Sequence, residues 1–177
     1  MRIDRLEMIS MAHVVGFVGL SNSGKTTLIS KLIIILRKKG LRVGVIKHDA
    51  HGHYKEAENT DSSRYMDSGA EAVVLSGKSQ LVRIEIPRTE PTLDELIEGM
   101  PELDLILVEG YKKSAYPKIA VFLYPEQTAI LEKLQGDLIA IVSGFSYNHM
   151  NKGIPLFEID DSIGIVEFVC KWMENSV

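Results

Sequence analysis

Gly19-Leu20-Ser21-Asn22-Ser23-Gly24-Lys25-Thr26 is the stretch that decides the fold of this chain. It follows the pattern of a glycine, any four residues, and then Gly-Lys-Ser/Thr. Glycines let the backbone wrap with its N–H groups pointing inward, which makes a nest for phosphate oxygens. In such a loop the lysine reaches the β- and γ-phosphates, and the hydroxyl after it ligates Mg²⁺. The stretch therefore predicts a nucleoside triphosphate site. Its candidate binding residues are Gly19, Ser21, Asn22, Ser23, Gly24, Lys25, Thr26 and Thr27.

The flanking segments supply the structural context that this motif requires. Residues 13–18 form a short, β-branched apolar run typical of a buried parallel strand. Within residues 28–36 a leucine recurs at every fourth position, which indicates one face of a helix. The cations and glycine of residues 37–40 are suited to end that helix. Residues 42–47 then read as a second strand, so the motif lies in a strand–helix–strand unit.

The rest of the chain continues this alternation of strands and helices. Turn residues between two of the strands predict a β-hairpin over about 72–86. We expect a three-layer α/β domain over 13–177 with a mostly parallel sheet, preceded by a polar N-terminal extension over 1–12. The expected strands are 72–75, 81–86, 104–108, 119–123 and 138–142, and the expected helices are 61–68, 92–98, 126–134 and 162–175.

Composition limits the classes of function open to the chain. Of its 177 residues, 45% are hydrophobic and 25% are charged, which is typical of a globular protein. The net charge of −4 argues against a nucleic-acid partner, since no basic field covers the whole chain. A single cysteine, Cys170, excludes an internal disulfide framework. Because no apolar stretch is long enough to span a bilayer, we expect a cytoplasmic protein without a membrane partner.

Two acidic residues stand where strands should end. Glu109 follows the strand at 104–108, and Asp49 follows the strand at 42–47. The carboxyl ends of parallel strands share one edge of the sheet with the phosphate loop, so both acids would face a bound nucleotide. Mg²⁺ prefers hard oxygen ligands, which makes Thr26, Asp49 and Glu109 the candidate metal residues. Asp104 begins its strand and is expected at the opposite edge.

A polar loop follows the second strand and supplies further candidates. His48, His51 and His53 crowd this loop, where they would contact a substrate or an anion, or have no functional role, or alternatively bind a transition metal. Lys47 is either a phosphate contact or a solvated strand-end lysine. Arg64, near the start of the helix at 61–68, is a candidate anion contact.

Four segments together resemble the MobB family, the accessory GTP-binding proteins of molybdopterin guanine dinucleotide biosynthesis. They are the phosphate loop at 21–27, Ile46-Lys47-His48-Asp49-Ala50-His51-Gly52, Asp61-Ser62-Ser63-Arg64 ahead of Gly69-Ala70, and Leu103 to Lys112 with the sequence LDLILVEGYK. The Lys-His-Asp and Val-Glu-Gly-Tyr-Lys pieces at this spacing are much more specific than the phosphate loop. From Glu126 onward the match is only architectural.

The resemblance implies a P-loop NTPase fold and a homodimer whose β-hairpin extends the sheet across the interface. It also implies GTP and Mg²⁺ as ligands, weak hydrolysis, and a role in helping the nucleotidyltransferase MobA to join GMP to molybdopterin, itself a possible second ligand. In that role Lys25 would stabilise charge on the β–γ bridge, and Asp49 would orient the attacking water. The chain departs from many GTPases because it lacks an Asn-Lys-x-Asp or Thr-Lys-x-Asp motif; Asn151-Lys152-Gly153-Ile154 has no acid.

One alternative uses the same scaffold for catalysis on a metabolite. A small-molecule kinase or ATP-dependent ligase of the dethiobiotin synthetase type would bind its acceptor in the polar loop, with Lys47 or Arg64 holding an anionic group. A partitioning ATPase is a further alternative, and the acidic net charge disfavours the DNA-facing surface that it needs. The sequence leaves open whether the protein is an enzyme beyond slow nucleoside triphosphate hydrolysis.

Overall fold

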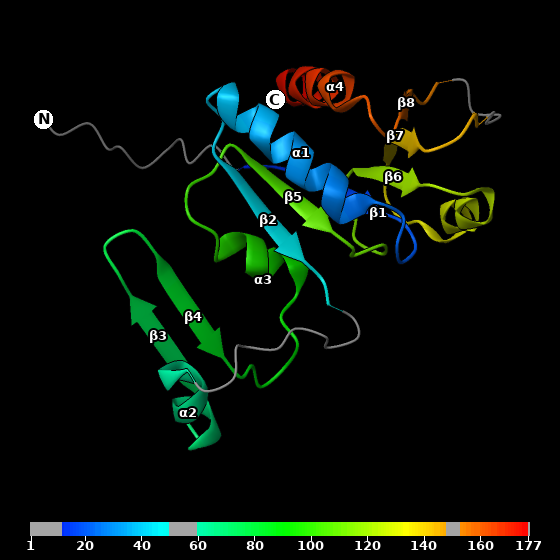
Figure 1. The fold of residues 1–177 in the computed structure, drawn as a ribbon. Helices are drawn as coiled ribbons and strands as arrows, with labels where there is room; N and C mark the ends of the chain where they lie inside the picture. The colour runs from blue at the N-terminus through cyan, green and yellow to red at the C-terminus, as the bar shows by residue number, and fades with distance from the viewer. Residues whose placement is uncertain (1–11, 50–59, 148–152, 177) are drawn as a thin grey trace, which may run out of the picture. The chain divides into compact units, whose positions relative to one another are not determined.

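A computed structural model describes residues 12–49, 60–147 and 153–176 (Figure 1). The chain divides into two compact units. One contains the described residues up to His48 and from Leu93 onward, and the other is Asp49–Thr92. The expectation of one domain over 13–177 stays a prediction. All but the last residue of the expected extension at 1–12 lies outside the described residues.

The first unit is built on a six-stranded sheet. Its strands are β1 (His13–Val18), β2 (Val43–Lys47), β5 (Leu105–Glu109), β6 (Lys118–Phe122), β7 (Leu138–Ser143) and β8 (Leu156–Glu158). They lie in the order β2-β5-β1-β6-β7-β8, and every neighbouring pair is parallel. The apolar runs of β1, β5 and β6 fit strands that are covered on both faces. Because β1 lies in the middle of the sheet, the loop that follows it emerges among the ends of the neighbouring strands.

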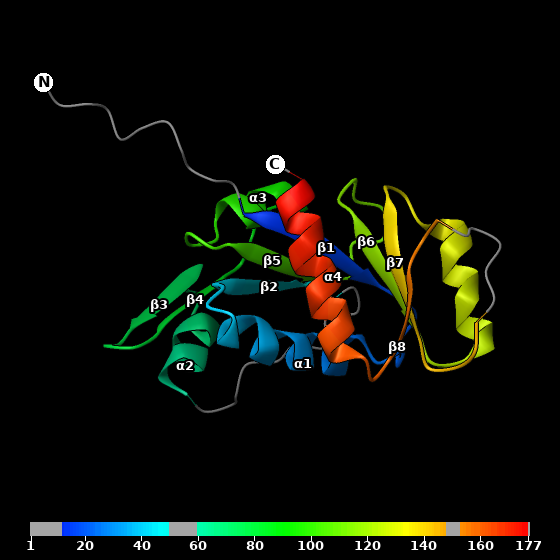
Figure 2. The same ribbon diagram turned by 90° about the horizontal axis from the view of Figure 1, so that it is seen from above.

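Helices cover both faces of this sheet and complete the three layers. Helices α1 (Lys25–Lys38) and α4 (Ser162–Asn175) lie side by side on one face (Figure 2). The other face is covered by α3 (Leu93–Glu98) and by a 3₁₀ helix, η1 (Pro125–Lys133). The predicted three-layer α/β fold with a mostly parallel sheet is confirmed.

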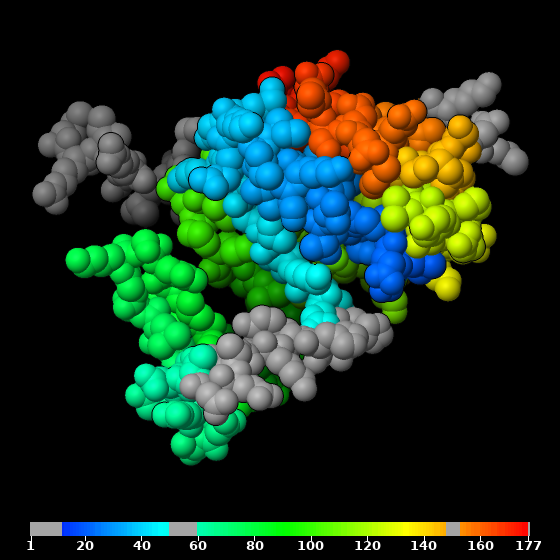
Figure 3. Space-filling model, viewed as in Figure 1, coloured from blue at the N-terminus to red at the C-terminus, as the bar shows by residue number. Residues whose placement is uncertain are grey.

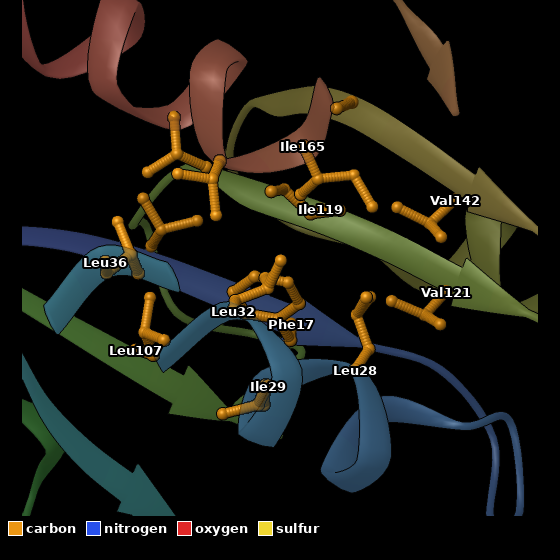
Figure 4. Close-up of a cluster of buried hydrophobic side chains, with 14 of the residues drawn as sticks. Phe17, Leu28, Ile29, Leu32, Leu36, Leu107, Ile119, Val121, Val142 and Ile165 are labelled. Carbon is orange, nitrogen blue, oxygen red and sulfur yellow. The ribbon is translucent and has the colours of Figure 1, made fainter. Parts of the chain in front are cut away.

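The main core lies between α1, α4 and the sheet. Leu28, Leu32 and Leu36 are each about 1% exposed, and they point from α1 onto the sheet beside Phe17 (Figure 4). From α4, Val166 and Val169 are buried and Met173 is half-buried. This packing fixes the start of α1 against the end of β1.

The second unit contains one helix and the expected hairpin. Helix α2 (Asp61–Asp67) begins after Thr60, whose side chain accepts a hydrogen bond from the backbone N–H of Ser63. Strands β3 (Ala72–Ser76) and β4 (Leu81–Glu85) pair antiparallel in a separate two-stranded sheet.

Three local expectations were wrong or incomplete. Residues 126–134, expected as an α-helix, lie mostly in the 3₁₀ helix η1. The sixth strand of the sheet, β8, was missed because it has only three residues. Strand β6 begins one residue earlier than expected, at Lys118, which is fully buried. No helix in the described ranges is both long and apolar enough to cross a membrane.

Candidate nucleotide-binding site

The turn between β1 and α1 is held by three backbone requirements. A Cβ on Gly19 would collide with the carbonyl oxygen of Val121 and with Oγ of Ser23. Asn22 and Gly24 have φ values of 58° and 85°, in the left-handed region. Gly24 is the N-cap of α1, and no side chain caps that helix end. The turn therefore directs the N–H groups at the start of α1 toward an anion.

Lys25 folds back over this turn. Its Nζ donates hydrogen bonds to the carbonyl oxygens of Leu20, at 2.7 Å, and Gly19, at 3.3 Å, and to Oγ of the buried Ser23, at 3.2 Å. The space-filling view shows the blue residues of the loop at the molecular surface (Figure 3). An anion that reaches the loop can thus meet an ammonium group that is already oriented.

A carboxylate from the end of another strand contacts the residue after Lys25. Oγ1 of Thr26 lies 3.0 Å from both Oε1 and Oε2 of Glu109, at the end of β5. Lys47, at the end of β2, lies opposite Glu109 in the register and places its Nζ 3.7 Å from Oε1. The side chain of Glu109 is 12% exposed and that of Lys47 is 57% exposed. The sheet therefore brings together three side chains that are far apart in the sequence.

Positive charge exceeds negative charge around the loop. Burial lowers the pKa of Lys25; the nearby Glu109 raises it, while Lys112 and Lys47 lower it further. Lys25 thus lies within electrostatic reach of two further lysines and one carboxylate. A polyphosphate would relieve the repulsion among the lysines and replace the backbone carbonyls as the partner of Lys25.

The chain turns sharply after Glu109, next to His48. Gly110 and Tyr111 have φ values of 102° and 47°. The rings of His48 and Tyr111 lie 4.7 Å apart, and the backbone N–H of His48 donates to the carbonyl of Glu109 at 2.9 Å. A Cβ on Gly110 would lie 3.0 Å from Cβ of His48. The glycine therefore allows the ends of β2 and β5 to approach closely.

Two other candidates, Asp49 and Arg64, belong to the second unit, so their proximity to the phosphate loop stays a prediction. His51 and His53 lie outside the described residues.

Within the described ranges, no three His, Cys, Asp or Glu side chains gather to hold a metal. Ser21 and Thr27 are exposed, at the loop and in the first turn of α1. Asp104 is at the opposite edge, as expected, paired with Arg42.

The chemistry of the donor set fits Mg²⁺ at this edge of the sheet. Thr26 and Glu109 offer a hydroxyl and a carboxylate in direct contact, and both are hard oxygen donors. Mg²⁺ usually keeps several waters and takes one or two protein oxygens beside the phosphates of its nucleotide. The two side chains therefore fit the protein's share of a magnesium site that a triphosphate would complete.

A buried lysine at the start of β6, Lys118, was not predicted from the sequence. Nζ of Lys118 donates to the carbonyl oxygens of Ser114, at 2.5 Å, and Tyr116, at 2.7 Å. These bonds hold the segment between β5 and β6, which also carries Lys112. The only signal in the sequence was a lysine directly before an apolar run, and such a residue usually indicates a solvated strand end.

A parallel sheet flanked by helices, with a Gly-x₄-Gly-Lys-Thr turn at the end of its central strand, defines a P-loop nucleotide-binding fold. Comparison with protein families narrows this class. Residues 14–144 match the family MobB, molybdopterin guanine dinucleotide synthesis protein B. The chain belongs to this family, and so to molybdenum cofactor biosynthesis.

Individual relatives agree over almost the whole chain. The probable molybdopterin-guanine dinucleotide biosynthesis adapter protein of Bacillus subtilis (strain 168) is 34% identical over 168 residues, covering 92% of this chain and 94% of that protein. The molybdopterin-guanine dinucleotide biosynthesis adapter protein of Escherichia coli (strain K12) is 33% identical over 175 residues, covering 94% and 96%. The crystal structure of Bacillus subtilis MobB, 33% identical, aligns with a TM-score of 0.72 over 90% of this chain and 96% of that chain.

Replacing Lys118 with methionine tests its supporting role. The variant keeps the apolar stem but leaves the carbonyls of Ser114 and Tyr116 without their donor. We expect the free energy of unfolding to fall by about 1–3 kcal/mol. Because burial lowers the pKa of Lys118, the folded chain binds fewer protons than the unfolded chain in the alkaline range below 10.5. The contribution of Lys118 to stability should therefore increase with pH in that range.

Denaturant unfolding at several pH values measures both effects. Lys113→Met is the matched control, since Lys113 is exposed in the same segment, and it should change stability by less than about 0.5 kcal/mol. Equal stability of Lys118→Met and Lys113→Met would contradict the role assigned to Lys118.

Proposed function

We propose that this protein is a GTP-binding adapter with weak Mg²⁺-dependent GTPase activity. In this proposal it assists the nucleotidyltransferase MobA in attaching GMP to molybdopterin, and it acts in the cytoplasm as a homodimer. Family membership and the adapter names of the relatives support the pathway. The observation that carries the nucleotide site is the contact of Lys25 with the loop carbonyls, beside the Thr26–Glu109 pair.

Each residue of the site would make a different contact with a bound triphosphate or its metal ion. Backbone N–H groups of the turn would hold the β-phosphate, and Lys25 would move from the Leu20 carbonyl to the β–γ bridge, where it would stabilise developing negative charge. Thr26 and Glu109 would hold Mg²⁺, with Asp49 as a further oxygen donor. The ion, when bound, neutralises charge on the phosphates. In the described part of the site Glu109 is held by Thr26 and Lys47, which fits a role in binding better than one in rapid proton transfer.

In this proposal, molybdopterin or MobA binds to the polar loop that follows β2. Lys47 and His48 lie at its start, beside Glu109. Arg64, exposed on α2, would add a contact to an anionic group of the second ligand.

The hairpin supports the proposed homodimer. Val74 is 58% exposed and Leu81 is 69% exposed, and the strand register places both on the same face. A two-stranded sheet alone is marginally stable in water, and exposed strand edges invite pairing with another chain. In the described ranges, β3 and β4 pair only with each other. A second copy would cover these apolar residues.

Lys25→Ala tests the triphosphate site. Loss of the ammonium group should weaken GTP binding by about 10- to 100-fold, because hydrogen bonds to charged groups contribute about 1.5–3 kcal/mol each. Titration calorimetry measures the affinity, and circular dichroism checks the fold. Lys38→Ala, at the other end of α1, is the control and should bind GTP normally. Unchanged affinity in Lys25→Ala would rule out the assigned site.

Glu109→Gln tests the metal role separately. We expect the increase in GTP affinity that Mg²⁺ produces to shrink, because the amide is a weaker ligand for the ion. GTP affinity in EDTA should stay equal or rise, since a negative charge near the phosphates is removed. Glu98→Gln, an exposed change at the end of α3, serves as the control. An unaltered response to Mg²⁺ in the Glu109 variant would contradict the assignment.

Leu81→Asp tests the dimer. A charge on the exposed face of the hairpin should convert a dimer into a monomer, which light scattering on a gel-filtration column detects as a halved mass. Ser79→Asp places the same charge in the adjacent turn and should leave the dimer intact. A monomeric parent protein, or a dimeric Leu81 variant, would refute this interface.

A further inference from the structure

A cavity lies at the same edge of the sheet as the phosphate loop. It has a volume of about 650 Å³ and is lined by residues 143–147, after β7, and by residues 156–160, in and after β8. This volume is in the range of sites that bind small molecules. All of its lining residues belong to the first unit. The cavity is therefore built on the same sheet that carries the phosphate loop.

Two observations place the cavity wall beside the phosphate loop and its helix. A Cβ built on Gly24, the N-cap of α1, would lie 3.7 Å from Cδ1 of Ile159 in the cavity wall. Further along α1, Nζ of Lys31 lies 3.1 Å from Oδ1 of Asp160. A nucleotide whose phosphates occupy the loop would thus have the cavity wall beside it.

The wall of the cavity has an aromatic component. Phe145 and Tyr147 are half-buried, and their ring centroids lie 5.8 Å and 4.9 Å from that of the buried Phe122. Oγ of Ser143 donates to the carbonyl of Phe145 at 2.8 Å and accepts from its N–H, which fixes the turn after β7. Rings held in this way offer a rigid surface for a planar heteroaromatic group.

The polar component of the wall is acidic. Glu158 and Asp160 both line the cavity, and an ionised carboxylate only accepts hydrogen bonds. Guanine offers two adjacent donors, N1–H and the 2-amino group, to a single carboxylate. Adenine offers its 6-amino group next to N1, whose lone pair would face the negative charge. A carboxylate at this position therefore favours guanine over adenine.

We infer that this cavity is the nucleobase subsite of the triphosphate site, and that Asp160 selects guanine by accepting hydrogen bonds from N1–H and the 2-amino group. The inference rests on the proposed function, because the phosphates must occupy the loop at Gly19–Thr26. Asp160 is assigned rather than Glu158 because it pairs with Lys31 of α1 and directly follows Ile159, which lies beside Gly24. Guanine selection thus takes place without an Asn-Lys-x-Asp or Thr-Lys-x-Asp motif.

Asp160→Asn provides the test because it inverts the hydrogen-bond pattern. The asparagine oxygen still accepts from N1–H, but its amide now donates, which suits the 2-oxo group of xanthine and opposes the 2-amino group of guanine. Affinities for GTP, XTP, ATP and inorganic tripolyphosphate are measured by calorimetry with Mg²⁺. We expect GTP affinity to fall about tenfold or more and XTP affinity to rise, with tripolyphosphate unchanged.

Glu158→Gln is the matched control and should keep the preference of the parent protein for GTP over XTP. Unchanged tripolyphosphate binding shows that Asp160→Asn is folded with its phosphate loop intact. If the parent protein binds GTP but Asp160→Asn keeps the same ratio of GTP to XTP affinity, the base assignment is wrong while the proposed function stands. A switch toward XTP in Glu158→Gln instead would also overturn the assignment to Asp160. If the parent protein binds neither tripolyphosphate nor any triphosphate, the proposed function itself fails.

Discussion

The backbone reversal between β1 and α1 is the constraint on which the rest of the site depends. The chain leaves a fully buried strand, turns within six residues, and enters a helix packed on the same sheet. Only a residue without a side chain fits at Gly19, and Gly24 adopts a left-handed conformation at the helix start. The core leucines of α1 hold the far side of this turn in place. As a result the orientation of the N–H groups is set by the packing of the fold, before any ligand arrives.

The parallel sheet explains how the remaining groups reach the loop. Glu109 and Lys47 end neighbouring strands and pair in the register, so both lie at the edge where β1 ends. Lys112 follows in the next segment, which Lys118 supports through two backbone carbonyls. The site thus collects three lysines and one carboxylate from distant parts of the sequence. Such an arrangement suits a polyanion with a divalent cation better than it suits a neutral substrate.

Much of the fold could be predicted because its signals are local. The phosphate loop, the leucine repeat of α1 and the apolar run of β5 each occupy one short segment. The parallel arrangement then placed Glu109 near Thr26 and Asp104 at the opposite edge, which the structure bears out. These successes share one cause: the period of a strand follows from its own residues, and a helix between two strands indicates that they are parallel.

The features that could not be predicted depend on tertiary contacts. Strand β8 is too short for a periodic pattern, and the 3₁₀ form of η1 is not distinguished from an α-helix by hydrophobic spacing. Lys118 is buried because carbonyls 2 and 4 residues earlier in the chain fold around its ammonium group. The cavity beside β7 and β8 likewise forms only when two segments from different strands meet. None of these features can be predicted from one stretch of the sequence alone.

A crystal structure of the protein with Mg²⁺ and a slowly hydrolysed GTP analogue is the most direct test of the proposed triphosphate site. We expect β-phosphate oxygens within about 3.2 Å of backbone nitrogens at the start of α1, a distance typical of hydrogen bonds. We also expect Nζ of Lys25 to leave the Leu20 carbonyl for the phosphates. A triphosphate bound elsewhere on the protein, with Lys25 still on the Leu20 carbonyl, would contradict this assignment.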